Sequence, residues 1–196
     1  MISKRKTAVV VFAGPNGSGK STVTDYAEKA GEYINADDIK AALNCSDLEA
    51  AQLAEKRREQ CLAEHKDFTF ETVLSTTRNL ELLKKAKANG YFVRCYYILT
   101  SSPDINVMRV AARVYSGGHS VPEDKIRSRY DRALALVPEL ISVCDVCNIY
   151  DNTTEPTRIF SKKLETYRLW ENDFWSKEKI IALTGRKSFD EEHLKA

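Results

Sequence analysis

The chain has 196 residues, of which 43% are hydrophobic and 30% charged, and its formal net charge is +2 at pH 7. This length suits one α/β domain with a sizeable core. The near-balanced charge argues against long nucleic acids as partners, since they need a basic stripe, and no apolar stretch is long enough to span a bilayer.

The first predicted element is a buried strand over 7–13, which runs directly into Gly-Pro-Asn-Gly-Ser-Gly-Lys-Ser at 14–21. This segment fits G-x-x-x-x-G-K-[ST], and a helix is predicted to follow over 21–30. Glycines let consecutive backbone N–H groups turn toward phosphate oxygens, and the start of the helix adds its positive end. The alternative, a glycine-rich turn with a chance lysine, does not explain why strand, loop and helix occur in this order.

The loop therefore predicts a site for a nucleoside triphosphate, which we take to be ATP, together with Mg²⁺. Lys20 is expected to reach the β- and γ-phosphates, and the Ser21 hydroxyl is expected to bind Mg²⁺. The predicted nucleotide-binding residues are Gly14, Pro15, Asn16, Gly17, Ser18, Gly19, Lys20, Ser21 and Thr22. The preference for ATP over GTP stays open.

A second strand is predicted over 32–36, at the start of "YINADDIK". Ligands of open α/β sheets bind beyond the carboxyl ends of the strands, so Asn35, Asp37 and Asp38 are expected to face the same crevice as the loop. A carboxylate there could take the proton of an attacking hydroxyl or help to organise Mg²⁺; alternatively, the Asp pair caps the next helix. We favour Asp37 as the catalytic residue and Asn35 as a substrate-binding one.

A third strand is predicted over 67–72, with the charge of Glu71 at its carboxyl end. A carboxylate at that point suits recognition of a substrate hydroxyl or amide, or an outer contact to magnesium. The alternative is a solvated strand end. We predict that Glu71 binds substrate.

A fourth strand is predicted over 91–99, and a helix follows it with Ser102 as N-cap and Pro103 in its first turn. Arg109 and Arg113 lie four residues apart and so share a face of this helix. The Gly117-Gly118 pair then predicts a turn before the next helix.

That next helix is predicted to open with a capping box formed by Ser120 and Glu123 and to run to about Val137. Its basic face carries Lys125, Arg129 and Arg132. Arginines on both sides of a mobile turn suit a lid over about 107–137 that clamps phosphate and excludes water, although a solvated basic face is the alternative. His119, beside the glycines, could contact substrate or fix the turn.

A fifth strand is predicted over 145–151, and Asp151-Asn152 at its end lies where a nucleotide base would pass. Cys144-Asp-Val-Cys147 has the form C-x-x-C, which can indicate a redox or metal-binding pair. Because the sequence shows no second pair of ligands and the segment enters a strand, we interpret these cysteines as structural. The five cysteines favour a reducing cytoplasmic setting.

The predicted fold is α/β: a P-loop NTPase kinase-like fold with a five-stranded parallel sheet, flanking helices and a helical lid. Residues 1–153 form the kinase core with its lid. Residues 154–196 are predicted to be a helical extension of the same domain with a mobile tail, and Trp170, Phe174 and Trp175 are predicted to pack on the core.

Five stretches taken in order, "GPNGSGKST", "INADDIK", "FTFETVLS", "RVAARVYSGGHSVPEDKIRSRY" and "IYDN", resemble the zeta-toxin-like P-loop kinases, especially the short form with GGH-x-VP. The likeness runs from about residue 7 to about 152. It implies transfer of the ATP γ-phosphate to the 3′-hydroxyl of the amino sugar in UDP-N-acetylglucosamine. One departure lies beside Glu71, which is followed here by Thr72-Val73 where the toxins have Gly-Thr.

The resemblance also implies roles for single residues. Lys20 and Ser21 would bind phosphate and magnesium, Asp37 would be the base, and Glu71 would bind substrate. Arg113 would be one catalytic arginine; near the place of a second one stands His119, with Arg127 and Arg129 as alternative suppliers.

The predicted function is an ATP-dependent phosphotransferase acting on a hydroxyl of a small molecule, with a nucleotide sugar such as UDP-N-acetylglucosamine as the expected acceptor. An antitoxin protein is a candidate partner, and membrane association is not expected. The alternatives are a kinase acting on another nucleotide, a nucleic-acid end or another metabolite, and a nucleotide-switched ATPase without an acceptor.

Overall fold

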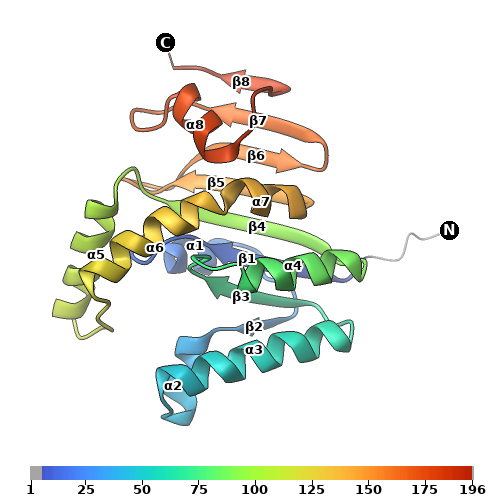
Figure 1. The fold of residues 1–196 in the computed structure, drawn as a ribbon, viewed down its shortest axis with the longest axis vertical. Helices are drawn as coiled ribbons and strands as arrows, with labels where there is room; N and C mark the ends of the chain where they lie inside the picture. Colours follow the sequence, from blue (N-terminus) through green and yellow to red (C-terminus); the bar gives the residue numbers. More distant parts are fainter. Residues whose placement is uncertain (1–5, 196) are drawn as a thin grey trace.

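Eight strands form one sheet in the order β2-β3-β1-β4-β5-β6-β7-β8 in the computed structural model, which describes residues 6–195 (Figure 1). The strands are β1 Ala8–Ala13, β2 Glu32–Ile34, β3 Phe68–Thr72, β4 Phe92–Leu99, β5 Val146–Asp151, β6 Thr157–Lys163, β7 Thr166–Trp170 and β8 Glu191–His193. The helices are α1 Lys20–Tyr26, α2 Ala36–Leu43, α3 Asp47–Ala63, α4 Arg78–Ala88, α5 Pro103–Tyr115, α6 Glu123–Ala135, α7 Val137–Val143 and α8 Lys177–Thr184.

The five strands predicted from the sequence are all present and parallel, in the order β2-β3-β1-β4-β5. β1 lies between β3 and β4, where Val11 pairs with Phe70 on one side and with Cys95 on the other. All three of these residues are fully buried, as expected for a central strand with a continuous apolar run. The carboxyl ends of these strands meet at one edge, and the phosphate-binding loop leaves β1 at that edge.

The prediction of a helical extension over 154–196 is wrong for most of that segment. β6 and β7 form an antiparallel hairpin that continues the sheet beyond β5, and only α8 is helical within 154–195. Within the described part of the segment predicted to be a mobile tail, β8 pairs with β7, and Phe189 packs on the core against Phe160. The sheet is therefore mixed, with five parallel strands and a C-terminal addition.

Two aromatic residues of the extension pack as predicted and one does not. Trp175 is buried in the core and Phe174 packs against it. Trp170 lies outside the core cluster, where the Arg158 guanidinium sits 4.3 Å from its ring centroid and the His193 ring stacks on it.

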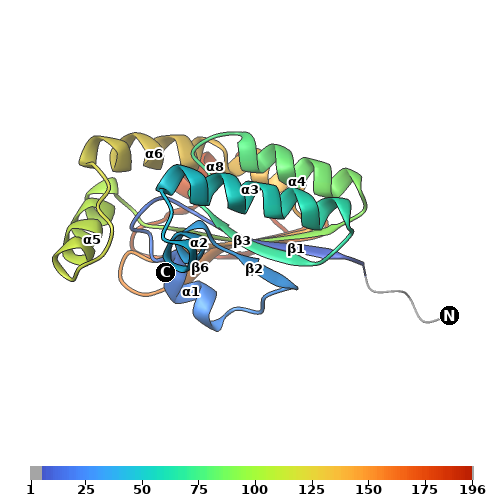
Figure 2. The same ribbon diagram turned by 90° about the horizontal axis from the view of Figure 1, so that it is seen from below.

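The helices cover the two faces of the sheet unequally (Figure 2). In that view α3, α4, α6 and α8 form a layer on one face, while α1 lies on the other. The main core lies under the helix layer, and a smaller cluster of Val10, Phe12 and Ile98 lies under α1. α5 projects beyond the carboxyl ends of the parallel strands, at the left of Figure 1, and α6 begins there.

The ends of three helices can be compared with the caps and boundaries predicted from the sequence. Ser102 caps α5 as predicted, because its side chain accepts a hydrogen bond from the Asp104 backbone N–H. The predicted capping box before α6 does not form: Pro122 is the N-cap, and Glu123 pairs with Arg127 instead. α1 ends at Tyr26, four residues earlier than predicted.

Among the helices of the described residues, none combines the length and hydrophobicity needed to cross a membrane.

Candidate active site

The phosphate-binding loop, residues 14–19, is held against the sheet so tightly that its glycines cannot be replaced without a clash. Gly14, Gly17 and Gly19 all have positive φ, at 143°, 76° and 86°. A Cβ on Gly17 would lie 2.5 Å from the Asn106 carbonyl oxygen, and a Cβ on Gly19 would lie 2.2 Å from the Asn152 side-chain nitrogen. The glycines thus serve close packing as well as backbone conformation.

Two asparagines hold the loop in place from the neighbouring segments. Asn106 on α5 donates from Nδ2 to the Asn16 carbonyl at 2.6 Å, and its own Oδ1 accepts a hydrogen bond from Thr100. Asn152, just beyond β5, donates from Nδ2 to the Ser18 carbonyl at 2.8 Å. The sequence placed Asn152 near the nucleotide but did not predict this role, and it gave no signal for Asn106.

Lys20 begins α1 and points back over the loop. Its Nζ donates to the carbonyl oxygens of Gly14 at 2.8 Å and Pro15 at 3.1 Å. Burial lowers the pKa of Lys20 to about 8, and the nearby Glu71 carboxylate opposes this shift only in part. An anion such as a phosphate would therefore be attracted to this partly desolvated ammonium.

Glu71, at the carboxyl end of β3, is fixed by two hydroxyl groups. Its Oε1 accepts from Thr24 Oγ1 at 2.9 Å and from the Tyr33 hydroxyl at 2.6 Å. Burial and this bond to a carboxylate raise the pKa of Tyr33 above its usual range. The sequence predicted Glu71 for this site but missed Thr24 and Tyr33, because a threonine inside a helix and a tyrosine inside a strand fit many roles.

These groups surround a cavity of about 400 Å³, which we call the loop cleft. It brings together the phosphate-binding loop, the start of α2, the end of β3 and one arginine of α5. The lining residues are Asn16, Gly17, Gly19, Lys20, Ser21, Asn35, Ala36, Asp37, Glu71, Thr72, Val73 and Arg113. Five further residues predicted to be catalytic, metal-binding or substrate-binding therefore line the same cleft as Lys20: Ser21, Asn35, Asp37, Glu71 and Arg113.

The start of α2 explains how Asp37 is available to the cleft. Asn35 is the N-cap, and its Oδ1 accepts a hydrogen bond from the Asp37 backbone N–H at 2.9 Å. Asn35 also donates from Nδ2 to the Tyr33 hydroxyl at 3.2 Å. The helix cap is thus made by Asn35, and the alternative in which the Asp37–Asp38 pair supplies it is wrong.

A second cavity of about 420 Å³, the adjoining cavity, lies next to the loop cleft. Both cavities are lined by Asn16, Ala36, Asp37 and Arg113. The rest of the adjoining cavity is lined by Lys40, Asp47, Ala50, Gly118, His119, Ser120 and Val121. Asp37 therefore stands on the boundary between the two spaces.

The basic residues of α5 and α6 do not all reach these cavities. Arg113 donates from Nη2 to the His119 carbonyl at 2.9 Å, and Arg129 donates from Nη1 to Asn16 Oδ1 at 3.4 Å. Arg127 instead forms surface ion pairs with Asp104 and Glu123 and lines neither cavity. The prediction that Arg127 binds substrate is therefore not supported by its position, whereas His119 and Arg129 lie beside the site.

The donor groups of the loop cleft fit a magnesium-bound triphosphate. Mg²⁺ prefers oxygen ligands, and the cleft offers the Ser21 hydroxyl and the carboxylates of Asp37 and Glu71. Ser18 belongs to the same loop but does not line the cleft; its hydroxyl is fully buried and has no hydrogen-bond partner among the described residues. Thr22, also predicted to bind nucleotide, is exposed and does not line the cleft.

Comparison with known proteins identifies relatives of this chain by sequence. A family model described as Zeta toxin matches residues 1–165. An uncharacterized protein of Haemophilus influenzae is 34% identical over 127 residues, which are 62% of this chain and 91% of that protein.

Solved structures share the fold at low sequence identity. The PezAT chromosomal toxin-antitoxin system of Streptococcus pneumoniae matches with a TM-score of 0.59 and 14% identity, covering 81% of this chain and 72% of that chain. The AvrRxo1-ORF1:AvrRxo1-ORF2 structure with sulphate ions matches with a TM-score of 0.70 and 14% identity, over 91% of this chain and 64% of that one. The chain therefore belongs to the zeta toxin family, and its family and fold indicate a P-loop kinase-type phosphotransferase.

Proposed function

We propose that this protein transfers the γ-phosphate of ATP to a hydroxyl group of a small molecule, and that the acceptor is a nucleotide sugar such as UDP-N-acetylglucosamine. The observation that carries this proposal is the position of Asp37, which lines both the loop cleft and the adjoining cavity. The triphosphate would occupy the loop cleft and the acceptor the adjoining cavity, with the carboxylate between them.

In this mechanism Asp37 is the general base. It takes the proton of the acceptor hydroxyl as that oxygen bonds to the γ-phosphorus, while the bond from the γ-phosphorus to the β,γ-bridging oxygen breaks and ADP leaves. Lys20 and Arg113 stabilise the charge that spreads over the transferred phosphoryl group. Ser21 would hold Mg²⁺ with Glu71 as an outer contact, and the ion would supply further neutralisation of the phosphate charge when bound.

The α5–α6 unit would serve as the lid of this site. The connection between the two helices contains Gly117 and Gly118, and residues 118–121 line the adjoining cavity. Movement at this turn would bring Arg113 and His119 closer to the reacting groups and exclude water. His119 and Glu71 are the substrate-binding residues we propose, with Asn35 and Arg129 in support.

The nature of the acceptor is supported by the chemistry of the adjoining cavity. Its walls include the Lys40–Asp47 ion pair, with Nζ and Oδ1 2.6 Å apart, together with His119 and Ser120. A lining that offers both donors and acceptors suits a ligand rich in hydroxyl and phosphate groups.

An antitoxin protein is the partner we propose, on the model of two neighbours that were solved as toxin-antitoxin or two-component complexes. Such a protein would act by covering the loop cleft or the adjoining cavity. Inhibition of the ATP-dependent activity by a co-purified protein would support this idea, and unchanged activity of the bound form would argue against it.

The proposal is tested by incubating the protein with γ-labelled ATP, Mg²⁺ and a panel of UDP-sugars, free nucleotides and short oligonucleotides. Mass spectrometry then identifies the species that gains one phosphate. A phosphorylated UDP-sugar is the expected result. Phosphorylation of only a nucleotide or an oligonucleotide end would overturn the acceptor assignment, and release of inorganic phosphate alone would overturn the kinase assignment.

A further inference from the structure

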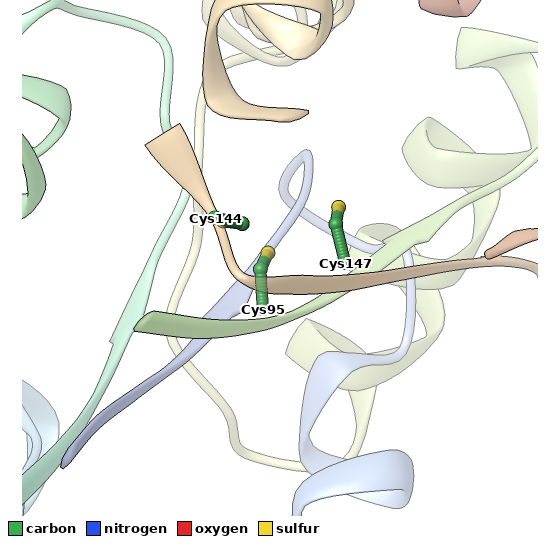
Figure 3. Close-up of side chains that lie close together, drawn as sticks. All are labelled: Cys95, Cys144 and Cys147. Carbon is green, nitrogen blue, oxygen red and sulfur yellow. The ribbon is translucent and has the colours of Figure 1, made fainter. Parts of the chain in front are cut away.

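Three cysteines that line neither of the cavities described above lie close together in the core of the protein (Figure 3). Cys95 lies on β4, Cys147 lies on β5, and Cys144 lies where the chain leaves α7 and enters β5. All three are at most 1% exposed, and their sulfur atoms lie within 4.8 Å of one another. The C-x-x-C pair of the sequence thus has a third thiol beside it, supplied by a neighbouring strand.

A buried positive charge lies next to this cluster. In the sheet, Cys147 pairs with Cys95 on one side and with Lys162 of β6 on the other, so the three side chains share one face. Lys162 is 7% exposed as a residue, and its ammonium donates to the carbonyl oxygens of Ile141 at 2.8 Å and Ser142 at 3.5 Å. No carboxylate of the described residues forms an ion pair with it.

A buried ammonium normally requires an anion nearby, since carbonyl groups carry no full charge. The groups on this face of the sheet that can ionise to anions are the thiols, because Lys162 pairs with Cys147 and Cys147 pairs with Cys95. Three thiolates with one ammonium would leave a charge of about −2 in the core, and a single divalent cation would bring the sum to zero.

We propose that Cys95, Cys144 and Cys147 bind one thiophilic divalent metal ion of the zinc class, with Lys162 as the buried countercharge. On binding, three S–H protons are released to solvent and three sulfur–metal bonds form, without oxidation or reduction. Zinc–sulfur bonds of about 2.3 Å place the sulfurs of a tetrahedral site about 3.8 Å apart. The three cysteine sulfurs lie within 4.8 Å of one another, so this spacing is compatible with their positions. Three thiolates leave one position of the tetrahedron, which a water molecule or another small ligand would have to fill for the site to be closed.

Such an ion would be structural. It would connect β4 to β5 and to the end of α7, in the middle of the sheet. β5 leads directly to Asn152, which holds the phosphate-binding loop through the Ser18 carbonyl. Metal binding is therefore expected to raise the thermal stability of the protein.

The test uses the full chain, purified and kept in reducing buffer. Elemental analysis and native mass spectrometry measure bound zinc, and titration with Cd²⁺ measures the ultraviolet thiolate-to-cadmium absorption band. The expected result is one ion per chain and an increase in melting temperature on addition of Zn²⁺. Single variants Cys95→Ala and Cys147→Ala are expected to lose stoichiometric binding, whereas Cys45→Ala and Cys61→Ala, outside the cluster, retain it.

Lys162→Met provides a second variant that keeps all three thiols, and it is expected to weaken Zn²⁺ binding at least tenfold in competition with a chelator. The proposal is overturned if the wild-type protein binds neither Zn²⁺ nor Cd²⁺ at one equivalent, or if binding persists in the Cys95→Ala/Cys147→Ala double variant. Detection of a disulfide among these cysteines in place of the metal would overturn it as well.

Discussion

The phosphate-binding loop and the adjoining cavity lie side by side, but they are built in opposite ways. The loop is held by side chains of two other segments, Asn106 and Asn152, and its glycines pack against backbone and side-chain atoms. The wall of the adjoining cavity at 118–121 is a connection between helices, in which His119 and Ser120 are exposed. In the proposed reaction, the donor side is therefore held by packed side chains, whereas the acceptor side depends on a connection that can change without altering how phosphate is held.

On the phosphate-binding loop, the largest loss of activity is expected from Lys20→Ala. This change removes the ammonium that would stabilise the transferred phosphate, so phosphoryl transfer should fall on the order of 10³-fold. Steady-state assays with saturating ATP measure the loss. Lys56→Ala, an exposed lysine on α3, is the matched control and should leave the rate unchanged; a similar loss in both variants would contradict the role of Lys20.

Gly17→Ala tests the rigidity of the loop. Gly17 and Gly90 have nearly the same φ, at 76° and 81°, but only Gly17 has atoms within reach of a new Cβ. Gly90→Ala should therefore lower the free energy of unfolding by about 1–2 kcal/mol through backbone strain alone. Gly17→Ala adds the overlap with the Asn106 carbonyl and should cost about 2–5 kcal/mol.

Urea unfolding measures both changes, and calorimetric titration with ATP measures the effect on binding. Gly17→Ala is expected to weaken ATP binding, and Gly90→Ala is expected to leave it unchanged. Equal losses of stability in the two variants would mean that the loop is not closely packed against α5.

The pH dependence of ATP binding follows from Lys20. Its pKa in the free protein is about 8, below its ordinary value, whereas bound phosphate favours the charged form. Below pH 8 the lysine is already protonated and affinity is at its highest. Above pH 8 binding must take up a proton, so affinity should fall by up to about tenfold per pH unit until the bound-state pKa is reached.

Calorimetry in buffers of different ionisation enthalpy measures this proton uptake directly. Its absence between pH 8 and 9 would contradict the assignment. The same pKa difference also makes the stability of the ligand-free protein depend on pH. Below pH 8 the buried, charged Lys20 lowers the free energy of unfolding by its full amount. This destabilisation decreases as the pH rises toward 10.5, the pKa of Lys20 in the unfolded chain.

The smallest effect is expected on the acceptor side, from His119→Ala. Because His119 lines only the adjoining cavity, its loss should raise the KM for the acceptor a few-fold, with the KM for ATP unchanged. Arg127→Ala serves as the control, since Arg127 lines neither cavity. A larger effect of Arg127→Ala than of His119→Ala would show that the lid occupies another position during the reaction.

The sequence predicted the donor half of the molecule well because its signals are local. The five parallel strands are short segments rich in apolar and aromatic residues, and the loop motif joins strand to helix without a gap. The residues around the loop were harder to predict. Asn106 and Tyr33 contribute through contacts with partners far away in the sequence, and such pairings depend on the three-dimensional structure.

The C-terminal segment was misread for a physical reason. The β6–β7 hairpin turns at Leu164, which adopts a φ of 55° although it is neither glycine nor asparagine. Without a turn signal, the mixture of charged and apolar residues in this segment was interpreted as a helix. The alternation of buried Tyr167 and Leu169 with partly exposed neighbours is the signal that favoured a strand.

The most direct test of the proposed mechanism compares Asp37→Asn with Asp38→Asn in single-turnover phosphorylation of the acceptor identified by the UDP-sugar panel. Both residues are exposed and lie in the first turn of α2, but only Asp37 lines the two cavities. Asp37→Asn should slow transfer by about 10²–10⁴-fold with ATP affinity preserved, and Asp38→Asn should change the rate less than a few-fold. An undiminished rate in Asp37→Asn would contradict the mechanism.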